Sequence, residues 1–174
     1  MYHLREIEKR DLPAINQWRN NEELIAQLGA PFRYINSDVE NEWFNKYLSC
    51  RSTSVRCAIT KEDDTIIAMI SLVGIDYLHQ CAELHIMIGQ CGDQNKGAGT
   101  FAVQKMLEHA FLNLNLNRVE LSVLPTNERA VHLYKKCGFS YEGTKRQARF
   151  KHGEYQDLCL YSILRNEFLN LMRE

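Results

Sequence analysis

The chain has 174 residues, of which 45% are hydrophobic and 25% are charged, a composition typical of one globular domain with a substantial core. A formal net charge of −1 gives no basic surface of the kind that nucleic-acid binders carry. The first residues lack an apolar signal core and no run approaches the ~18 apolar residues of a membrane span, so we expect a protein that is neither exported nor inserted in a membrane. Six dispersed cysteines without paired histidines exclude a disulfide scaffold or a zinc site. We therefore expect a single cytoplasmic domain over residues 1–174 that holds no metal and binds neither nucleic acid nor membrane.

The N-terminal half alternates strand and helix signals. A strand is predicted over residues 2–7, followed by a helix that Asp11 caps. After a loop-rich segment over residues 20–36, a second helix begins at the capping box Ser37-x-x-Glu40. Three further strands, which should pair as an antiparallel meander, are predicted near residues 55–60, 65–72 and 82–88.

The C-terminal half adds two helices and three strands. One helix follows a glycine-rich loop and carries apolar residues at helical spacing from Ala102 to Leu114. A strand over residues 119–123 leads to a second helix, which Asn127 opens and Gly138 ends. Two closing strands are predicted over residues 139–142 and 158–164.

The glycine-rich loop is the most informative segment of the chain. The strand over residues 82–88 delivers the backbone to Gln94-Asn95-Lys96-Gly97-Ala98-Gly99, which opens a helix. The glycines remove side chains, while the helix start presents unpaired N–H groups and the positive end of its dipole. This segment predicts a site for an anionic ligand, above all a phosphate.

Two known phosphate-binding motifs fit this loop poorly. A P-loop needs Lys and Ser/Thr where Ala98 and Gly99 stand. A dinucleotide fingerprint matches Gly97-x-Gly99-x-x-Ala102 and is followed by Glu120, but its strand should run almost directly into the first glycine. The third candidate, Gln/Arg-x-x-Gly-x-Gly/Ala, is matched at every fixed position.

A second motif accompanies that third candidate. The pattern Asn-x-x-Ala-x-x-x-Tyr-x-x-x-Gly-Phe is filled by Asn127, Ala130, Tyr134, Gly138 and Phe139. With both motifs in this order and spacing, the chain resembles the GNAT superfamily of acetyl-CoA-dependent N-acetyltransferases. The likeness covers most of the chain and is nearest to the branch that contains ribosomal-protein N-terminal and spermidine acetyltransferases.

The resemblance implies a fold and a reaction. The expected fold is α/β in layers, with a central, mixed, mostly antiparallel twisted sheet of about seven strands, helices on both faces, and the fourth and fifth strands splayed to admit acetyl-CoA. The expected reaction moves the acetyl group from acetyl-CoA, the cosubstrate, to a primary amine by direct attack in a ternary complex. A homodimer or a higher homo-oligomer is also implied.

The resemblance also assigns residues to the cofactor. The strand before the loop lends backbone groups to the pantetheine and the thioester carbonyl, the loop binds the pyrophosphate, and Tyr134 is the general acid at the departing thiol. The expected cofactor-binding residues are Ile86, Met87, Ile88, Gln94, Asn95, Lys96, Gly97, Ala98, Gly99, Thr100, Asn127 and Tyr134.

A base is needed on the amine side, because an amine with a pKa of roughly 10 is protonated and non-nucleophilic at neutral pH. Glu83 stands where acetyltransferases of this branch carry a carboxylate. His85 shares its strand face by period-two geometry. Glu83 is the first candidate, while His85 and solvent remain open.

The acceptor is left open among a polyamine, an amino sugar and a protein N-terminus. The segment Trp18-Arg19-Asn20 resembles amino-sugar and ribosomal-protein acetyltransferases, whereas Tyr155-Gln156-Asp157 resembles spermidine acetyltransferases. The acidic loop typical of the spermidine enzymes is replaced by residues 29–34. Arg19 and Arg33 suit an acceptor that carries phosphate or carboxylate.

A different class of function is a non-catalytic module that binds acyl-CoA and reports its level to a partner. Such a sensor needs the phosphate loop but not the proton-transfer groups. Because the chain has both Tyr134 and Glu83, the enzyme is favoured.

Overall fold

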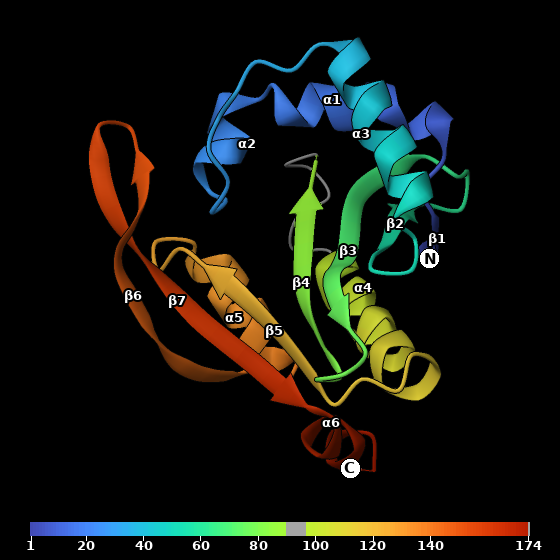
Figure 1. The fold of residues 1–174 in the computed structure, drawn as a ribbon, viewed down its shortest axis with the longest axis vertical. Helices are drawn as coiled ribbons and strands as arrows, with labels where there is room; N and C mark the ends of the chain where they lie inside the picture. Colours follow the sequence, from blue (N-terminus) through green and yellow to red (C-terminus); the bar gives the residue numbers. More distant parts are fainter. Residues whose placement is uncertain (90–96, 174) are drawn as a thin grey trace.

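A computed structural model describes residues 1–89 and 97–173, and these residues build a seven-stranded sheet with helices packed on both faces (Figure 1). The strands are β1 (His3–Glu6), β2 (Val55–Thr60), β3 (Ile66–Asp76), β4 (Cys81–Ile88), β5 (Arg118–Val123), β6 (Ser140–Lys151) and β7 (Glu154–Leu164). They lie in the order β1-β2-β3-β4-β5-β7-β6, and every neighbouring pair is antiparallel except β4 and β5, which are parallel. The predicted mixed, mostly antiparallel sheet is confirmed.

The helices lie between and beyond these strands. They are α1 (Leu12–Arg19), α2 (Glu22–Ala26), α3 (Ser37–Ser49), α4 (Ala98–Glu108), α5 (Glu128–Lys136) and α6 (Arg165–Leu171), with a 3-10 turn η1 (Lys9–Asp11) before α1 and a π-helical turn η3 (His109–Asn113) after α4. In this part of the chain, no helix has both the length and the apolar character that crossing a bilayer requires.

Side-chain alternation along β3 divides the interior into two apolar cores. Ala68, Ile70 and Leu72 belong to the core that α4, η3, α5 and α6 cover. Met69, between them in sequence, belongs to the core under α1, α2 and α3. Successive residues of a strand point to opposite faces, so this one strand supports both helical layers.

The start of α1 differs in one respect from the prediction. Asp11 does stand at the N-cap position, but its side chain makes no capping hydrogen bond. Its carboxylate instead accepts a bond from the Glu8 backbone N–H at 2.8 Å and pairs with Arg5, also at 2.8 Å. Asp11 therefore closes the turn before the helix and ties it to β1.

The predicted capping box of α3 is wrong. The N-cap is Asn36, whose side-chain oxygen accepts a hydrogen bond from the Val39 N–H at 3.0 Å, so Ser37 is already the first helical residue. Glu40 is only 1% exposed, and its carboxylate lies 3.0 Å from the Arg19 guanidinium. The side chain that the sequence pattern assigned to the cap, Glu40, forms a buried ion pair instead.

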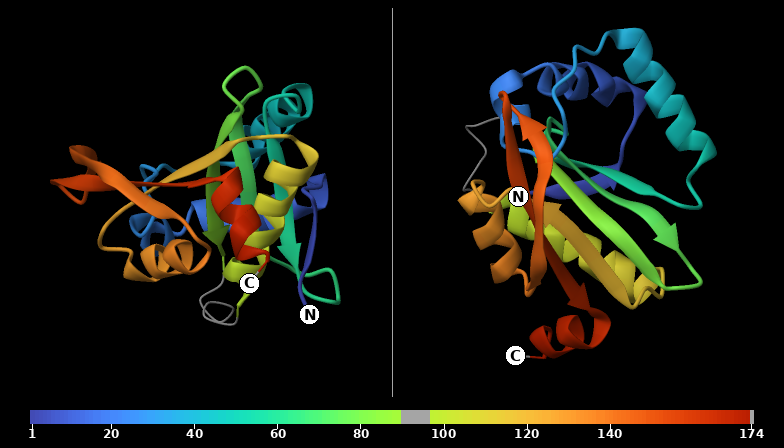
Figure 2. Two further views of the ribbon diagram at one scale, coloured as in Figure 1. Left: turned by 90° about the horizontal axis from the view of Figure 1, so that it is seen from below. Right: turned by 60° about the vertical axis from the view of Figure 1, so that its left-hand side comes forward.

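The structure contains two helices that were not predicted and a hairpin longer than predicted. The short helix α2 lies inside the predicted loop over residues 20–36, and α6 follows the last strand. The β6–β7 hairpin is much longer than the predicted strands 139–142 and 158–164. The prediction was too short because most side chains of β6 are exposed, so no apolar alternation marks the strand in the sequence. The hairpin extends past the sheet to the neighbourhood of α2 (Figures 1 and 2).

Candidate active site

A wedge between β4 and β5 forms the site. The parallel ladder pairs residues 81–83 with residues 118–120 and stops there, although β4 continues to Ile88 and β5 to Val123. The two strands then separate (Figure 1). Two cavities of about 300 Å³ and about 590 Å³ occupy the wedge, and their shared lining residues are Gln27, Leu28, Ile86, Met87, Asn127, Ala130 and Tyr134. The predicted splay between the fourth and fifth strands is confirmed.

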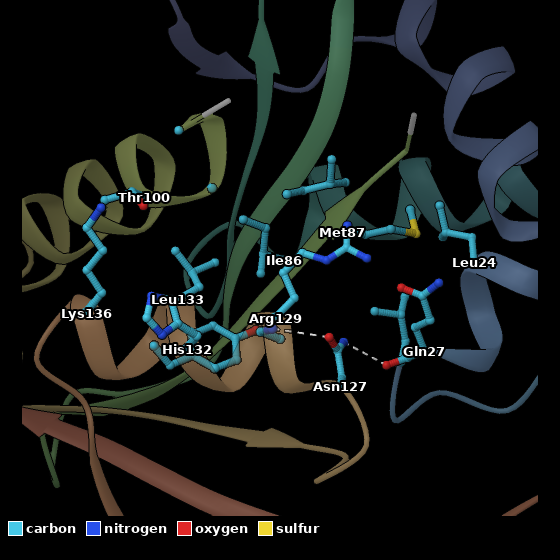
Figure 3. A pocket seen from close by; sticks show the side chains of 16 residues that line it. Leu24, Gln27, Ile86, Met87, Thr100, Asn127, Arg129, His132, Leu133 and Lys136 are labelled. Atoms are coloured by element: carbon cyan, nitrogen blue, oxygen red, sulfur yellow. Dashed lines mark hydrogen bonds between the residues drawn. The ribbon is translucent and has the colours of Figure 1, made fainter. Parts of the chain in front are cut away.

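The smaller cavity lies where β4, the first turn of α4 and α5 meet (Figure 3). Gly97 is the N-cap of α4 with φ of 85°, a left-handed conformation that disfavours residues with a Cβ. A Cβ at Gly99 would lie 3.1 Å from the Leu133 side chain, so this glycine lets α4 approach α5. The helix start therefore directs free N–H groups to the cavity, as an anion site requires.

Most of the predicted cofactor residues meet at this cavity. Those that line it are Ile86, Met87, Ile88, Gly97, Gly99, Thr100, Asn127 and Tyr134. The side chain of Ala98 is buried in the core, and the predicted contact of its backbone with the cofactor stays a prediction. Gln94, Asn95 and Lys96 lie outside the described residues, so the predicted contacts of the loop before Gly97 stay predictions.

A cationic face of α5 was missed by sequence reasoning. Arg129, His132, Leu133 and Lys136 line the smaller cavity. In Figure 3, Lys136 extends from α5 toward Thr100 at the start of α4, and Arg129 reaches across toward Met87. The spacing i, i+3, i+4, i+7 places these residues on one helix face, and that pattern was the available signal. Positive charge beside a helix N-terminus suits a phosphorylated ligand.

Asn127 connects the two halves of the site. Its side-chain oxygen caps α5 by accepting a hydrogen bond from the Ala130 N–H at 3.2 Å. Its amide nitrogen donates to the backbone carbonyl of Gln27 at 2.9 Å, a bond drawn in Figure 3. The predicted cap is confirmed, and the same residue also holds the loop after α2 against α5.

Tyr134 stands where the two cavities meet. It is 6% exposed and its ring packs edge-on against Phe139, with ring centroids 5.8 Å apart. Burial raises the pKa of its hydroxyl above the ordinary value, which keeps the phenol protonated at neutral pH. Among the described residues the hydroxyl has no hydrogen-bond partner, so it is available to a bound ligand.

Glu83 and His85 lie together in the larger cavity. Successive positions on one face of β4 bring His85 Nε2 to 3.2 Å from Glu83 Oε1, as the period-two pattern predicts. The hydrogen bond from His85 lowers the pKa of Glu83, partial burial opposes this, and the charges of Lys145 and Arg149 add to the lowering. Glu83 is therefore a carboxylate at neutral pH, and the pair forms a polar dyad inside the wedge.

Arg19 and Arg33 also line the larger cavity, as predicted. They are joined by Arg149 from β6, which sequence reasoning missed. Only the long hairpin places this residue near β4, and no local motif marks it. The larger cavity thus gathers side chains from α1, the loop after α2, β4 and β6.

The loop after α2 is held by two cations of the hairpin. The buried Lys151 ammonium donates to the backbone carbonyls of Ile25 at 2.7 Å and Ala30 at 2.8 Å, and also to that of Leu28. Arg149 Nε donates to the Gly29 carbonyl at 3.0 Å. Burial lowers the pKa of Lys151. Together these bonds fix the segment over residues 25–30, whose Gln27 and Leu28 line both cavities.

The site therefore combines an anion-binding helix start, a narrow cleft beside unpaired strand edges, a buried tyrosine and a second chamber with a carboxylate–imidazole dyad. Such a combination is the one that a transferase acting on an acyl-CoA thioester requires.

Comparison with known proteins identifies the family. Residues 2–140 match the acetyltransferase (GNAT) domain. The spermidine N(1)-acetyltransferase of Vibrio cholerae is 32% identical over 96% of this chain and 95% of its own length. A putative ribosomal N-acetyltransferase of Bacillus subtilis is 33% identical over 61% of this chain and 57% of its own. The crystal structure of spermidine N-acetyltransferase from Vibrio cholerae with CoA and spermine has a TM-score of 0.90 at 31% identity, over 97% of this chain and 98% of that one.

This chain belongs to the GNAT acetyltransferase family and is an acetyl-CoA-dependent N-acetyltransferase. The resemblance inferred from the two short motifs is thereby confirmed, and so is the branch with spermidine and ribosomal-protein acetyltransferases.

Proposed function

We propose that this enzyme acetylates a primary amine of a small molecule, which enters the larger cavity and attacks the thioester while acetyl-CoA fills the smaller one. The observation that carries this proposal is the meeting of the two cavities at Tyr134, with the Glu83–His85 dyad on the acceptor side. This arrangement lets amine and thioester approach each other without a covalent enzyme intermediate.

The smaller cavity supplies the cofactor contacts. The N–H groups at the start of α4, together with Arg129 and Lys136, bind the phosphates of CoA. Beyond residue 83 the edge of β4 that faces β5 makes no ladder bonds with any described residue, so the backbone of residues 86–88 is available to pair with the pantetheine arm. An N–H of the same segment stabilises the oxyanion that forms at the thioester carbonyl.

Two proton transfers complete the reaction. Glu83 and His85 act as a pair: a carboxylate that accepts a bond from Nε2–H orients the ring, leaves Nδ1 free for the proton of the amine, and stabilises the imidazolium that results. Tyr134, kept protonated by burial, delivers a proton to the departing thiolate. The products are an amide and CoA with a free thiol.

Two acceptor classes have specific support. Likeness to spermidine N-acetyltransferases favours a polyamine. The arginines of the larger cavity favour an amine that also carries an anionic group. The two observations favour different acceptors, so the assay must include both classes.

The experiment is a thiol-release assay with acetyl-CoA and a panel of amines, followed by mass spectrometry of the products. The panel contains spermidine, spermine, glucosamine 6-phosphate, β-alanine and an N-terminal peptide. We expect acetylation of a small-molecule amine and little reaction with the peptide. Tight binding of acetyl-CoA with no product from any amine would contradict the proposal and favour a sensor of acyl-CoA.

A further inference from the structure

The charged groups of the larger cavity are mostly cationic. Among the described residues, its lining includes Arg19, Arg33 and Arg149 but a single carboxylate, Glu83. A site that evolved around a polycation would be expected to present several carboxylates, because opposite charge both steers and holds such a ligand. In this cavity the cationic side chains of the lining outnumber the carboxylates.

Two of the three guanidinium groups have no carboxylate partner. Arg19 is neutralised by the buried Glu40 at 3.0 Å and is stacked on the Trp43 ring at 4.1 Å from its centroid. Within the described part of the chain, Arg149 donates to the backbone carbonyls of Gly29 and Ala148, at 3.0 and 2.8 Å, and to no carboxylate. Arg33 forms no ion pair within residues 1–89 and 97–173 and is exposed at the cavity.

The remaining charges do not change this balance. Glu83 already accepts the bond from His85 and lies within the electrostatic influence of Lys145 and Arg149. A further cation, Lys151, stands two residues from Arg149 and is surrounded by backbone carbonyls. The cavity therefore has uncompensated positive charge on the side that β6 and the loop after α2 provide.

We propose that the acceptor amine belongs to a molecule that also carries a carboxylate or a phosphate, and that Arg33 and Arg149 bind this anionic group while the amine points toward the Glu83–His85 dyad. This inference rests on the proposed acetyl transfer. Guanidinium presents a planar fork of donors that matches both kinds of anion, so the structure assigns the shared chemistry, an anionic oxygen group. A volume of about 590 Å³ is ample for a small metabolite of this kind.

Matched acceptor pairs test this inference. β-Alanine is compared with β-alaninamide, glucosamine 6-phosphate with glucosamine, and all four with spermidine, by kcat/KM. We expect the anionic member of at least one pair to exceed its neutral partner roughly ten- to hundredfold, the factor that one or two charge-assisted hydrogen bonds represent. The pair that responds distinguishes a carboxylate from a phosphate.

Variants connect the preference to the two arginines. Arg33→Gln and Arg149→Gln should raise KM for the preferred anionic acceptor. They should also reduce the difference in kcat/KM between this acceptor and its neutral partner, while KM for acetyl-CoA stays near the wild-type value. Because Arg149 also holds Gly29, Arg33→Glu gives a second test with no backbone bond at risk, and it should shift the preference toward spermidine. The matched control is Arg146→Gln, on exposed β6 and outside both cavity linings.

The outcomes are separable. Wild-type enzyme that prefers spermidine over both anionic amines would overturn this inference and leave the proposed acetyl transfer intact. Unchanged selectivity in the Arg33 variants would also overturn it. If no amine is acetylated, calorimetric titration of the CoA-saturated enzyme still decides: binding of glucosamine 6-phosphate or β-alanine over spermidine supports the anionic pocket, and binding of spermidine alone refutes it.

Discussion

The two cavities of this enzyme are built in opposite ways. The smaller one is lined mainly by short contiguous segments at residues 86–88, 97–100 and 127–136, held by local helix capping and glycine conformation. The larger one gathers residues from distant parts of the chain, and its loop is fixed by bonds such as Lys151 to Ile25. If the proposed assignment of the two cavities is correct, local backbone geometry binds the cofactor, whereas the acceptor site depends on contacts between distant parts of the chain.

The largest effect is expected where the two cavities join. Tyr134→Phe keeps the ring packed against Phe139 but removes the proposed proton donor, so kcat should fall by roughly 10²–10⁴. Binding of acetyl-CoA and of the acceptor should change little, because neither cavity loses volume. Steady-state kinetics measures kcat, and calorimetry measures the binding of acetyl-CoA and of the acceptor. A variant with wild-type kcat would show that solvent protonates the thiolate.

A smaller loss of rate is expected on the acceptor side. Glu83→Gln removes the charge that stabilises a protonated His85, so kcat/KM should drop by about 10²-fold at neutral pH. The pKa of Glu83 lies below its usual value, so the wild-type carboxylate is ionised throughout the neutral range. The deficit should therefore shrink as pH rises toward the pKa of the amine, which then arrives unprotonated. Parallel pH profiles for variant and wild type would exclude Glu83 from proton transfer.

The cofactor side can be disturbed through its backbone. Gly97→Val places a β-branched residue at φ of 85°, and the strain should weaken acetyl-CoA binding roughly tenfold while acceptor KM stays constant. Among residues 1–89 and 97–173, no atom lies within 4 Å of a Cβ built at this position, so we expect the loss to come from backbone conformation or from the cofactor itself. Gly74→Val, with φ of 60° and equally free surroundings, is the matched control, and it should lose stability without losing affinity.

The long-range bonds of the acceptor side give the next effect. Lys151→Met leaves carbonyl groups of residues 25–30 without their donor, which should cost about 2 kcal/mol of unfolding free energy and raise acceptor KM several-fold. The KM for acetyl-CoA should rise less. Lys151→Arg, which keeps the charge and donors, should recover part of the loss. Urea denaturation and two-substrate kinetics check both expectations.

The smallest effect concerns an ion pair far from either cavity. Bonds from Arg118 and Ser162 lower the pKa of Glu142 to about 2. A carboxylate whose pKa is depressed by folding stabilises the protein above its unfolded value of about 4.3, and this contribution is lost as pH falls toward 2. Glu142→Gln should therefore lower Tm slightly at neutral pH and converge with wild type in acid. A constant difference across pH would contradict this assignment.

The sequence predicted the cofactor half of the site because its signals are local. The Asn127 cap, the glycines of α4 and Tyr134 each occupy a fixed spacing along one element. The prediction for Glu40 was wrong, because a local capping pattern contains no information about Arg19, which lies beside Glu40 in the interior. Arg149 was not predicted for a related reason. It reaches the cavity beside β4 through a long, exposed hairpin, and no apolar alternation in the sequence marks that hairpin.

The early end of the β4–β5 ladder has a thermodynamic consequence. From residue 84 to Ile88, the edge of β4 that faces β5 has no ladder partner among the described residues, so a ligand that pairs with it would act as a missing strand of the sheet. Folding and cofactor occupancy are then linked, because anything that binds only the native state stabilises it by mass action. At a CoA concentration 100 times its Kd the gain is about 2.7 kcal/mol, so the heat resistance of this protein should follow the supply of its own substrate.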